Sequence, residues 1–185
     1  KARALRKKEK EEEILRVENL NVMGDRGQLA VKDVSFSVRA GEVLGIAGIE
    51  GNGQKELVEA LTGLRRVESG KILFLGRDVT NSPVIELIKS GMAYIPEDRI
   101  GRGVAPDLAV VDNSVLKVFR DEPFSIGMRI VRDAMKAFCE KIVNLFKVKC
   151  PSIEAPVKFL SGGNIQRLIV GRELSTNAKL IIAEN

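Results

Sequence analysis

The chain has 185 residues, of which 44% are hydrophobic and 30% are charged, a balance typical of a globular domain. It contains no histidine, which removes the commonest metal ligand and the commonest general base. The formal net charge is +5, but one tyrosine and no tryptophan argue against a nucleic-acid surface built on base stacking.

The chain begins with a run of mixed charge. Residues 1–13 hold six basic and four acidic side chains, and six minus four gives a local net charge of +2. Such a run has little to bury, so we expect a charged linker that is mobile or forms an exposed helix. The folded domain is expected over residues 14–185. Cys139 and Cys150 lack metal-ligand spacing and are expected to be reduced structural residues.

The first half of the domain reads mainly as strands. Residues 14–20 and 31–38 alternate between apolar and polar side chains, which predicts two strands joined by a hairpin loop at 24–27. Residues 43–48 (VLGIAG) are continuously apolar and predict a strand buried on both faces of a parallel sheet. A helix is expected next, ending at Gly63.

The second half alternates between strands and helices. Residues 69–76 and 92–95 predict strands on either side of a short helix at 84–90, and the Gly- and Pro-rich residues 96–109 predict a loop. The longest helical pattern runs over residues 126–148. Its core-facing stripe is predicted to consist of Val131, Met135, Phe138, Ile142 and Leu145.

The end of the chain has a Gly-rich turn that opens a helix, followed by the apolar strand KLIIAEN, which ends in an acidic residue. Strands that alternate with helices predict an α/β fold with a mostly parallel core sheet.

A glycine loop after the apolar run is the first candidate site. Gly48 and Gly53 have the spacing of a phosphate-binding loop, G-x-x-x-x-G-K-[ST], in which backbone N–H groups and a helix N-terminus face an anion. Gln54 replaces the lysine, and Lys55 comes one residue late, about 100° further round the helix. The expected nucleotide-binding set is Gly48, Glu50, Gly51, Asn52, Gly53, Gln54, Lys55 and Glu56. Because the motif's lysine position and its hydroxyl position hold other residues, and Glu50 repels phosphate, we expect weak or absent binding of ATP or ADP and of Mg²⁺ in the isolated domain.

A second motif is more specific. Leu160, Ser161, Gly162, Gly163 and Asn164 spell LSGGN, which resembles the signature of ATP-binding-cassette (ABC) ATPases. The serine and the glycine N–H groups at a helix start form an anion site. The resemblance implies that this site faces the ATP held by a partner domain.

Two further positions extend the resemblance. In the family, the apolar strand ends in Asp-Glu, where Asp supports Mg²⁺ and Glu polarises water. Here Glu184 stands at the Asp position, and Asn185 leaves the catalytic base position empty. Glu97, within IPEDR, stands where the family has a Gln in the loop that couples to the membrane subunit.

Together, IPEDR, the GNGQ loop and LSGGN resemble the second ATP-binding half of tandem importers for simple sugars or nucleosides. The resemblance implies an ABC domain with an antiparallel β subdomain and a helical subdomain near residues 110–160, and a chain that stops before the domain's C-terminal part. It further implies a second ABC domain, upstream in the same chain, and transmembrane permease subunits as partners, with the domain at the cytoplasmic face of the membrane and no nucleic acid bound. The alternatives left open are a tandem ABC protein that acts on ribosomes or nucleic acid, and a non-hydrolysing interaction module.

Overall fold

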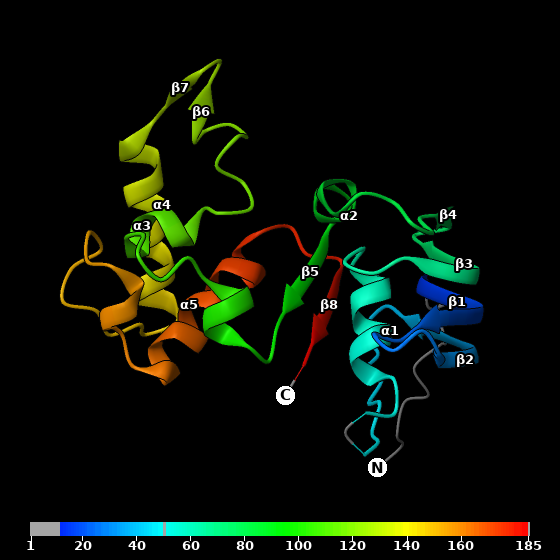
Figure 1. Ribbon diagram of the computed structural model, residues 1–185. Coiled ribbons are helices and arrows are strands. Elements are labelled where there is room, and N and C mark those ends of the chain that lie inside the picture. The colour runs from blue at the N-terminus through cyan, green and yellow to red at the C-terminus, as the bar shows by residue number, and fades with distance from the viewer. Residues whose placement is uncertain (1–11, 50, 185) are drawn as a thin grey trace, which may run out of the picture. The chain divides into compact units, whose positions relative to one another are not determined.

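The computed structural model describes residues 12–49 and 51–184. The predicted linker therefore lies almost wholly outside the described residues, as do Glu50 and Asn185. The chain divides into two compact units, Lys1–Ser90 and Gly91–Asn185. The elements of each unit are labelled in Figure 1.

The first unit is built on one antiparallel sheet with strand order β2-β1-β3-β4. The strands are β1 (Glu13–Met23), β2 (Leu29–Arg39), β3 (Val67–Phe74) and β4 (Arg77–Asp78). The central strand β1 buries Leu15, Val17, Leu20 and Val22. The two N-terminal strands and the hairpin loop between them are thus confirmed.

The described residues of this unit also form the helices α1 (Gln54–Leu61), which contacts β1 and β2, and α2 (Val84–Ser90). Gly63 follows the end of α1 with a positive φ of 74°, as expected for a glycine that ends a helix.

The predicted strand at residues 43–48 is wrong. The structure shows irregular chain there, with Val43 95% and Ile46 51% exposed. A strand needs a neighbouring strand to satisfy its backbone hydrogen bonds. The described strands of this unit form a single antiparallel sheet in which residues 43–48 have no place.

The second unit contains the parallel strands β5 (Met92–Ile95) and β8 (Leu180–Ala183), paired in register from Met92 opposite Leu180. Among the described residues this pair is the parallel part of the fold. Around it lie the π-helical turn η1 (Arg99–Gly103), α3 (Val110–Ser114), the hairpin β6 (Ser125–Ile126) and β7 (Arg129–Ile130), α4 (Arg132–Leu145), the 3₁₀ turn η2 (Val157–Phe159) and α5 (Gly162–Ser175).

The long helix is shorter than predicted. Residues 125–130 form a hairpin, so α4 begins at Arg132, and Val131 precedes the helix. Within α4, Met135, Cys139 and Ile142 are buried, whereas Leu145 is 66% exposed. Spacings of four, three and four along a 3.6-residue period place residue 146 on the buried face instead of Leu145.

The core of the second unit joins α3, α4 and α5. Cys139 is fully buried in it, Cys150 packs against it, and both cysteines are free. Helices α3 and α4 fall within residues 110–160, the predicted helical subdomain, whose boundaries stay a prediction.

Candidate functional site

The glycine loop enters α1 through a residue that must be glycine. Gly53 has φ 93° at the helix N-cap, and a side chain there would collide with the backbone carbonyl of Ala30 in β2. Gly51 has φ 88°, and the N–H of Asn52 donates to the Ile49 carbonyl over 3.2 Å. The described part of this segment therefore makes a tight turn into α1, and its role as a phosphate cradle stays a prediction.

Gln54, the first residue of α1, turns back onto the loop. Its Nε2 lies 3.4 Å from the Ile49 carbonyl oxygen, to which it donates. A Cβ on Gly48 would collide with the same amide group in this position, so a larger residue there would require the Gln54 side chain to move. The side chain at the lysine position thus lies against the loop itself and carries no charge.

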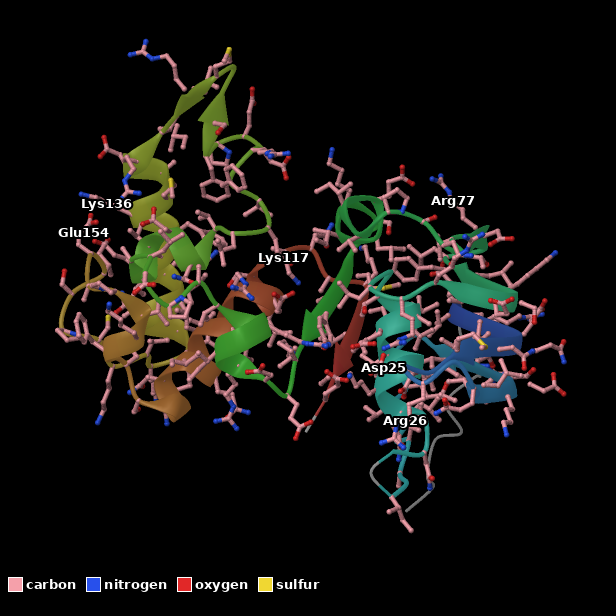
Figure 2. The ribbon with its side chains drawn as sticks, in the orientation of Figure 1. Asp25, Arg26, Arg77, Lys117, Lys136 and Glu154 are labelled. Carbon is pink, nitrogen blue, oxygen red and sulfur yellow. The ribbon has the colours of Figure 1, made fainter. Side chains whose placement is uncertain are left out.

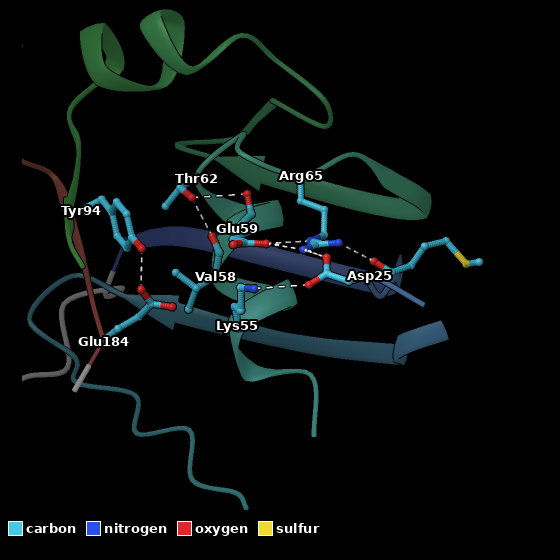
Figure 3. A network of polar contacts seen from close by, with 9 residues as sticks. Asp25, Lys55, Val58, Glu59, Thr62, Arg65, Tyr94 and Glu184 are labelled. Carbon is cyan, nitrogen blue, oxygen red and sulfur yellow. Dashed lines mark hydrogen bonds and ion pairs between the residues drawn. The ribbon is translucent and has the colours of Figure 1, made fainter. Parts of the chain in front are cut away.

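Lys55 points to a different partner. Its Nζ lies 3.4 Å from Asp25 Oδ2, in the loop between β1 and β2 (Figure 3). Arg65 binds the other oxygen of Asp25 over 2.6 Å and binds Glu59 over 2.7 Å. These contacts lower the pKa of Asp25, chiefly through the hydrogen bond from Arg65. Glu56, also in the predicted nucleotide-binding set, is half-buried in the first turn of α1.

The signature residues begin α5. Leu160 is buried, whereas Ser161, Gly162 and Gly163 are exposed. Ser161 is the N-cap with extended backbone, and its carbonyl accepts from the N–H groups of Asn164 and Ile165. The first N–H groups of a helix have no acceptor within the helix, and its N-terminus carries partial positive charge. This end of α5 can therefore receive an anion.

Asn164 ties the signature to its surroundings. Its Nδ2 donates to Ser161 Oγ over 2.9 Å, and its Oδ1 accepts from the Lys149 N–H over 2.9 Å. Arg99 lies beside the same end, because a Cβ on Gly162 would be 3.6 Å from an Arg99 guanidinium nitrogen. Sequence reasoning did not assign Arg99 a place here, although it belongs to the IPEDR motif.

A buried ion cluster holds the other end of α5. Glu173 is 1% exposed, and its Oε2 accepts from Lys117 over 2.5 Å and from the Tyr94 N–H over 3.2 Å. Its Oε1 accepts from Arg172 over 3.1 Å. Arg172 also donates to the carbonyls of Gly103 and Asn113. The Glu173 side chain thus joins α5 to β5 and to the segment after α3, which contains Lys117 (labelled in Figure 2).

The acidic residue that follows β8, Glu184, is hydrogen-bonded to a tyrosine of the same unit. The Tyr94 hydroxyl donates to Glu184 in a short hydrogen bond, and the Glu184 N–H donates to the Ile95 carbonyl over 3.0 Å. Burial and the Glu184 carboxylate raise the pKa of Tyr94 to about 12. Glu97 is exposed just after β5, and its neighbour Asp98 caps η1 by accepting from the Gly101 N–H over 2.8 Å.

These residues do not fit a tight Mg²⁺ site. Mg²⁺ requires near-octahedral oxygen ligands. Gln54 and Lys55 supply no hydroxyl where the phosphate-loop pattern has one, and the Glu184 carboxylate accepts the Tyr94 hydrogen bond. Over residues 12–49 and 51–184, no group of three or more Cys, Asp or Glu could hold a metal ion.

A glycine loop that opens α1, an antiparallel sheet beside it and an exposed LSGGN turn that opens α5 together define an ATP-binding-cassette domain. A model of the family described as ABC transporter matches residues 31–185. The chain belongs to the ABC transporter family.

The similar proteins are import components. The chain is 41% identical over 174 residues to a glucose import ATP-binding protein of Haloferax volcanii, a match that covers 93% of the chain and 32% of the relative. It is 37% identical to a guanosine import ATP-binding protein of Bacillus subtilis, covering 92% of the chain and 34% of that relative. The chain thus spans about a third of the length of the curated relatives it matches.

Solved structures agree on the fold. A nucleotide-free ATP-binding cassette from an ABC transporter superposes with a TM-score of 0.72 at 27% identity, covering 92% of the chain and 68% of that structure. An ATP-binding cassette solved in its ADP conformation gives a TM-score of 0.70 at 26% identity, covering 91% of the chain and 67% of that structure. The predicted ABC ATPase fold is confirmed, and the family binds ATP and ADP. In the part of the chain that the structure describes, no helix is long and apolar enough to cross a membrane.

Proposed function

We propose that this chain is an ATP-binding domain of an importer for simple sugars or nucleosides. Its relatives carry glucose, guanosine and nucleoside import in their names, at 36–41% identity over most of the chain. The proposal places the domain against transmembrane permease subunits at the cytoplasmic face of the membrane, beside a second ABC domain of the same protein.

Within that assembly, the chain's main contribution is its signature. The observation that carries this role is the contrast between the two anion sites. Ser161, Gly162 and Gly163 are exposed at the start of α5. In contrast, the side chains of the glycine loop are engaged within their own unit: Gln54 with Ile49, and Lys55 with Asp25. A partner's ATP would therefore find its phosphate-binding groups at the signature.

The glycine loop is proposed to bind ATP or ADP weakly and to hydrolyse it poorly. The loop keeps the glycines of the motif but offers no lysine at position 54 and no hydroxyl at position 55. The sequence also places an amide, Asn185, where the family has its catalytic carboxylate. An amide cannot accept a proton as a carboxylate does, so no general base is supplied at this position.

Mutating the two anion sites tests the assignment. In the two-domain protein with its permease, Ser161→Arg would place a long side chain between the signature and the ATP held by the partner domain, and it would remove the serine hydroxyl. ATPase activity should fall by about 100-fold or more, the scale of removing a donor that stabilises the transition state. Gln54→Ala should reduce activity by less than about 3-fold. This limit corresponds to a weak neutral hydrogen bond.

Ser152→Arg is the matched control, because Ser152 is an exposed loop residue of the same unit whose hydroxyl accepts a local backbone N–H. It should leave the ATPase unchanged. Equal losses for Ser161→Arg and Gln54→Ala, or a larger loss at Gln54, would show that this loop hydrolyses ATP and that the roles are reversed.

Restoring the loop tests the weak binding. Gln54→Lys combined with Lys55→Ser recreates the phosphate-loop pattern, and calorimetry should show tighter ATP binding by roughly 10-fold or more, the worth of one charge-assisted contact. Equal affinities in the two proteins would place the defect elsewhere in the site.

A further inference from the structure

Asp25 bridges two cations beside the glycine loop. Its Oδ1 is 2.6 Å from an Arg65 guanidinium nitrogen, and its Oδ2 is 3.4 Å from Lys55 Nζ. Asp25 comes from the loop between β1 and β2, Lys55 from the first turn of α1, and Arg65 from the segment after α1. Figure 3 shows the three side chains converging.

Arg65 is the fixed member of this group. Its side chain is 19% exposed, and it also donates to Glu59, whose side chain is 6% exposed, and to the Met23 carbonyl over 3.1 Å. Because Arg65 is held on three sides, it anchors the Asp25 carboxylate. The other oxygen of Asp25 is then available to Lys55, the more exposed cation, with a side chain 52% exposed.

Lys55 is the cation that the glycine loop retains. Gln54, at the lysine position of the motif, is neutral, and the lysine that follows it is paired with a carboxylate of the same chain. Lysine has a flexible four-carbon stem and acts as a point charge, so a released Lys55 could turn toward a ligand in the loop. While Lys55 is paired with Asp25, its ammonium group is not free to make this contact.

We propose that Asp25 is an internal competitor for phosphate groups and determines how tightly the glycine loop binds a nucleotide. The proposal rests on the proposed function, because it concerns the same nucleotide site. The ligand class is a polyphosphate chain, free or carried by a nucleoside. Such a ligand must displace Asp25 from Lys55 or bind against its charge, and either event weakens binding.

Asp25→Asn tests this directly, because asparagine keeps the shape and can still accept from Arg65 but lacks the charge. The whole chain is titrated with inorganic tripolyphosphate and with ATP by calorimetry at low ionic strength. Tripolyphosphate should bind roughly 2- to 5-fold more tightly to Asp25→Asn than to the wild type, the range expected for one exposed ion pair. The gain should shrink at high salt because exposed charges are screened.

Two controls separate this contact from general charge effects. Asp78→Asn makes the same charge change on β4, at the far edge of the sheet from β2, and should leave tripolyphosphate affinity unchanged. Adding Lys55→Met to Asp25→Asn should abolish the gain, since no released lysine remains. Urea unfolding of each variant confirms that the fold is retained.

The proposal is overturned if Asp25→Asn binds tripolyphosphate no better than the wild type or Asp78→Asn, if the gain survives Lys55→Met, or if no variant binds it measurably. Failure of the proposed function looks different. In that case the restored loop, Gln54→Lys with Lys55→Ser, would fail to bind ATP, while the tripolyphosphate comparison would still decide the role of Asp25.

Discussion

Removing the buried carboxylate of Glu173 should destabilise the second unit strongly. Glu173→Ala leaves Arg172, with a side chain 4% exposed, and Lys117, with a side chain 21% exposed, without their shared anion. Breaking a buried ion pair by removing one partner typically costs about 3–5 kcal/mol. Arg172 keeps two backbone carbonyls and Lys117 reaches solvent in part, so we expect about 2–4 kcal/mol here.

The shift in the pKa of Lys117 reflects the burial of this cluster. Burial lowers the pKa of Lys117 even though the Glu173 carboxylate lies against it and raises that pKa. Removing the carboxylate takes away the group that favours the charged amine. Lys117→Met in the Glu173→Ala background should therefore cost less than Lys117→Met in the wild type, and this difference is the coupling between the two residues.

Urea unfolding followed by circular dichroism measures these effects, with the midpoint and slope giving the free energy of unfolding. Glu173→Gln serves as a matched variant that keeps the side-chain shape and one acceptor oxygen but replaces the other oxygen with an amide donor, so it should cost less than the alanine. A loss below about 1 kcal/mol for Glu173→Ala, the size of an exposed pair, would refute the view that this cluster anchors α5.

Two other outcomes are expected. Gly171→Ala should destabilise the protein by up to about 2 kcal/mol, since the new Cβ would lie 2.6 Å from Ile142 and 2.9 Å from Phe146. This overpacking outweighs the better helix propensity of alanine. Gly163→Ala on the same helix, where a Cβ meets open space, should be neutral or stabilising in the same urea assay. Tyr94 is the chain's one tyrosine, so alkaline titration of tyrosinate absorbance should give a pKa near 12 in the folded protein and near 10 in urea, and Glu184→Gln should lower the folded value. Because the folded pKa is raised, the stability from Tyr94 is complete below pH 10 and is lost as pH rises toward 12; Tyr94→Phe should remove this loss, and a folded pKa near 10 would contradict the contact with Glu184.

Local patterns in the sequence were sufficient for several parts of this protein. Alternating residues predicted β1 and β2, because one face of an antiparallel strand is buried and the other is not. Gly53 was identified by its spacing from Gly48, and its backbone conformation is one that only glycine adopts easily. The LSGGN run was placed correctly at the start of a helix, since serine and glycine there leave donors for an anion.

Other parts depend on which segments meet in three dimensions. The run VLGIAG is apolar enough for a buried strand, but an apolar run becomes a strand only beside a neighbour that completes its hydrogen bonds. Within 126–148, hydrophobic periodicity could not separate the hairpin at 125–130 from the helix that follows it. The buried face of α4 continues from Ile142 into the next turn, and Leu145 lies outside that face.

The sequence by itself determined which chemical groups the two anion sites possess: glycines at 48 and 53, a glutamine in place of a lysine, and an intact signature. Only the tertiary structure decided what those groups face. Asp25 and Lys55 are 30 residues apart in the chain, and Lys117 and Glu173 are 56 apart. Such pairings follow from strand order and helix packing, which bring together residues far apart in the chain. The sequence around a charged residue does not indicate which residue will pair with it.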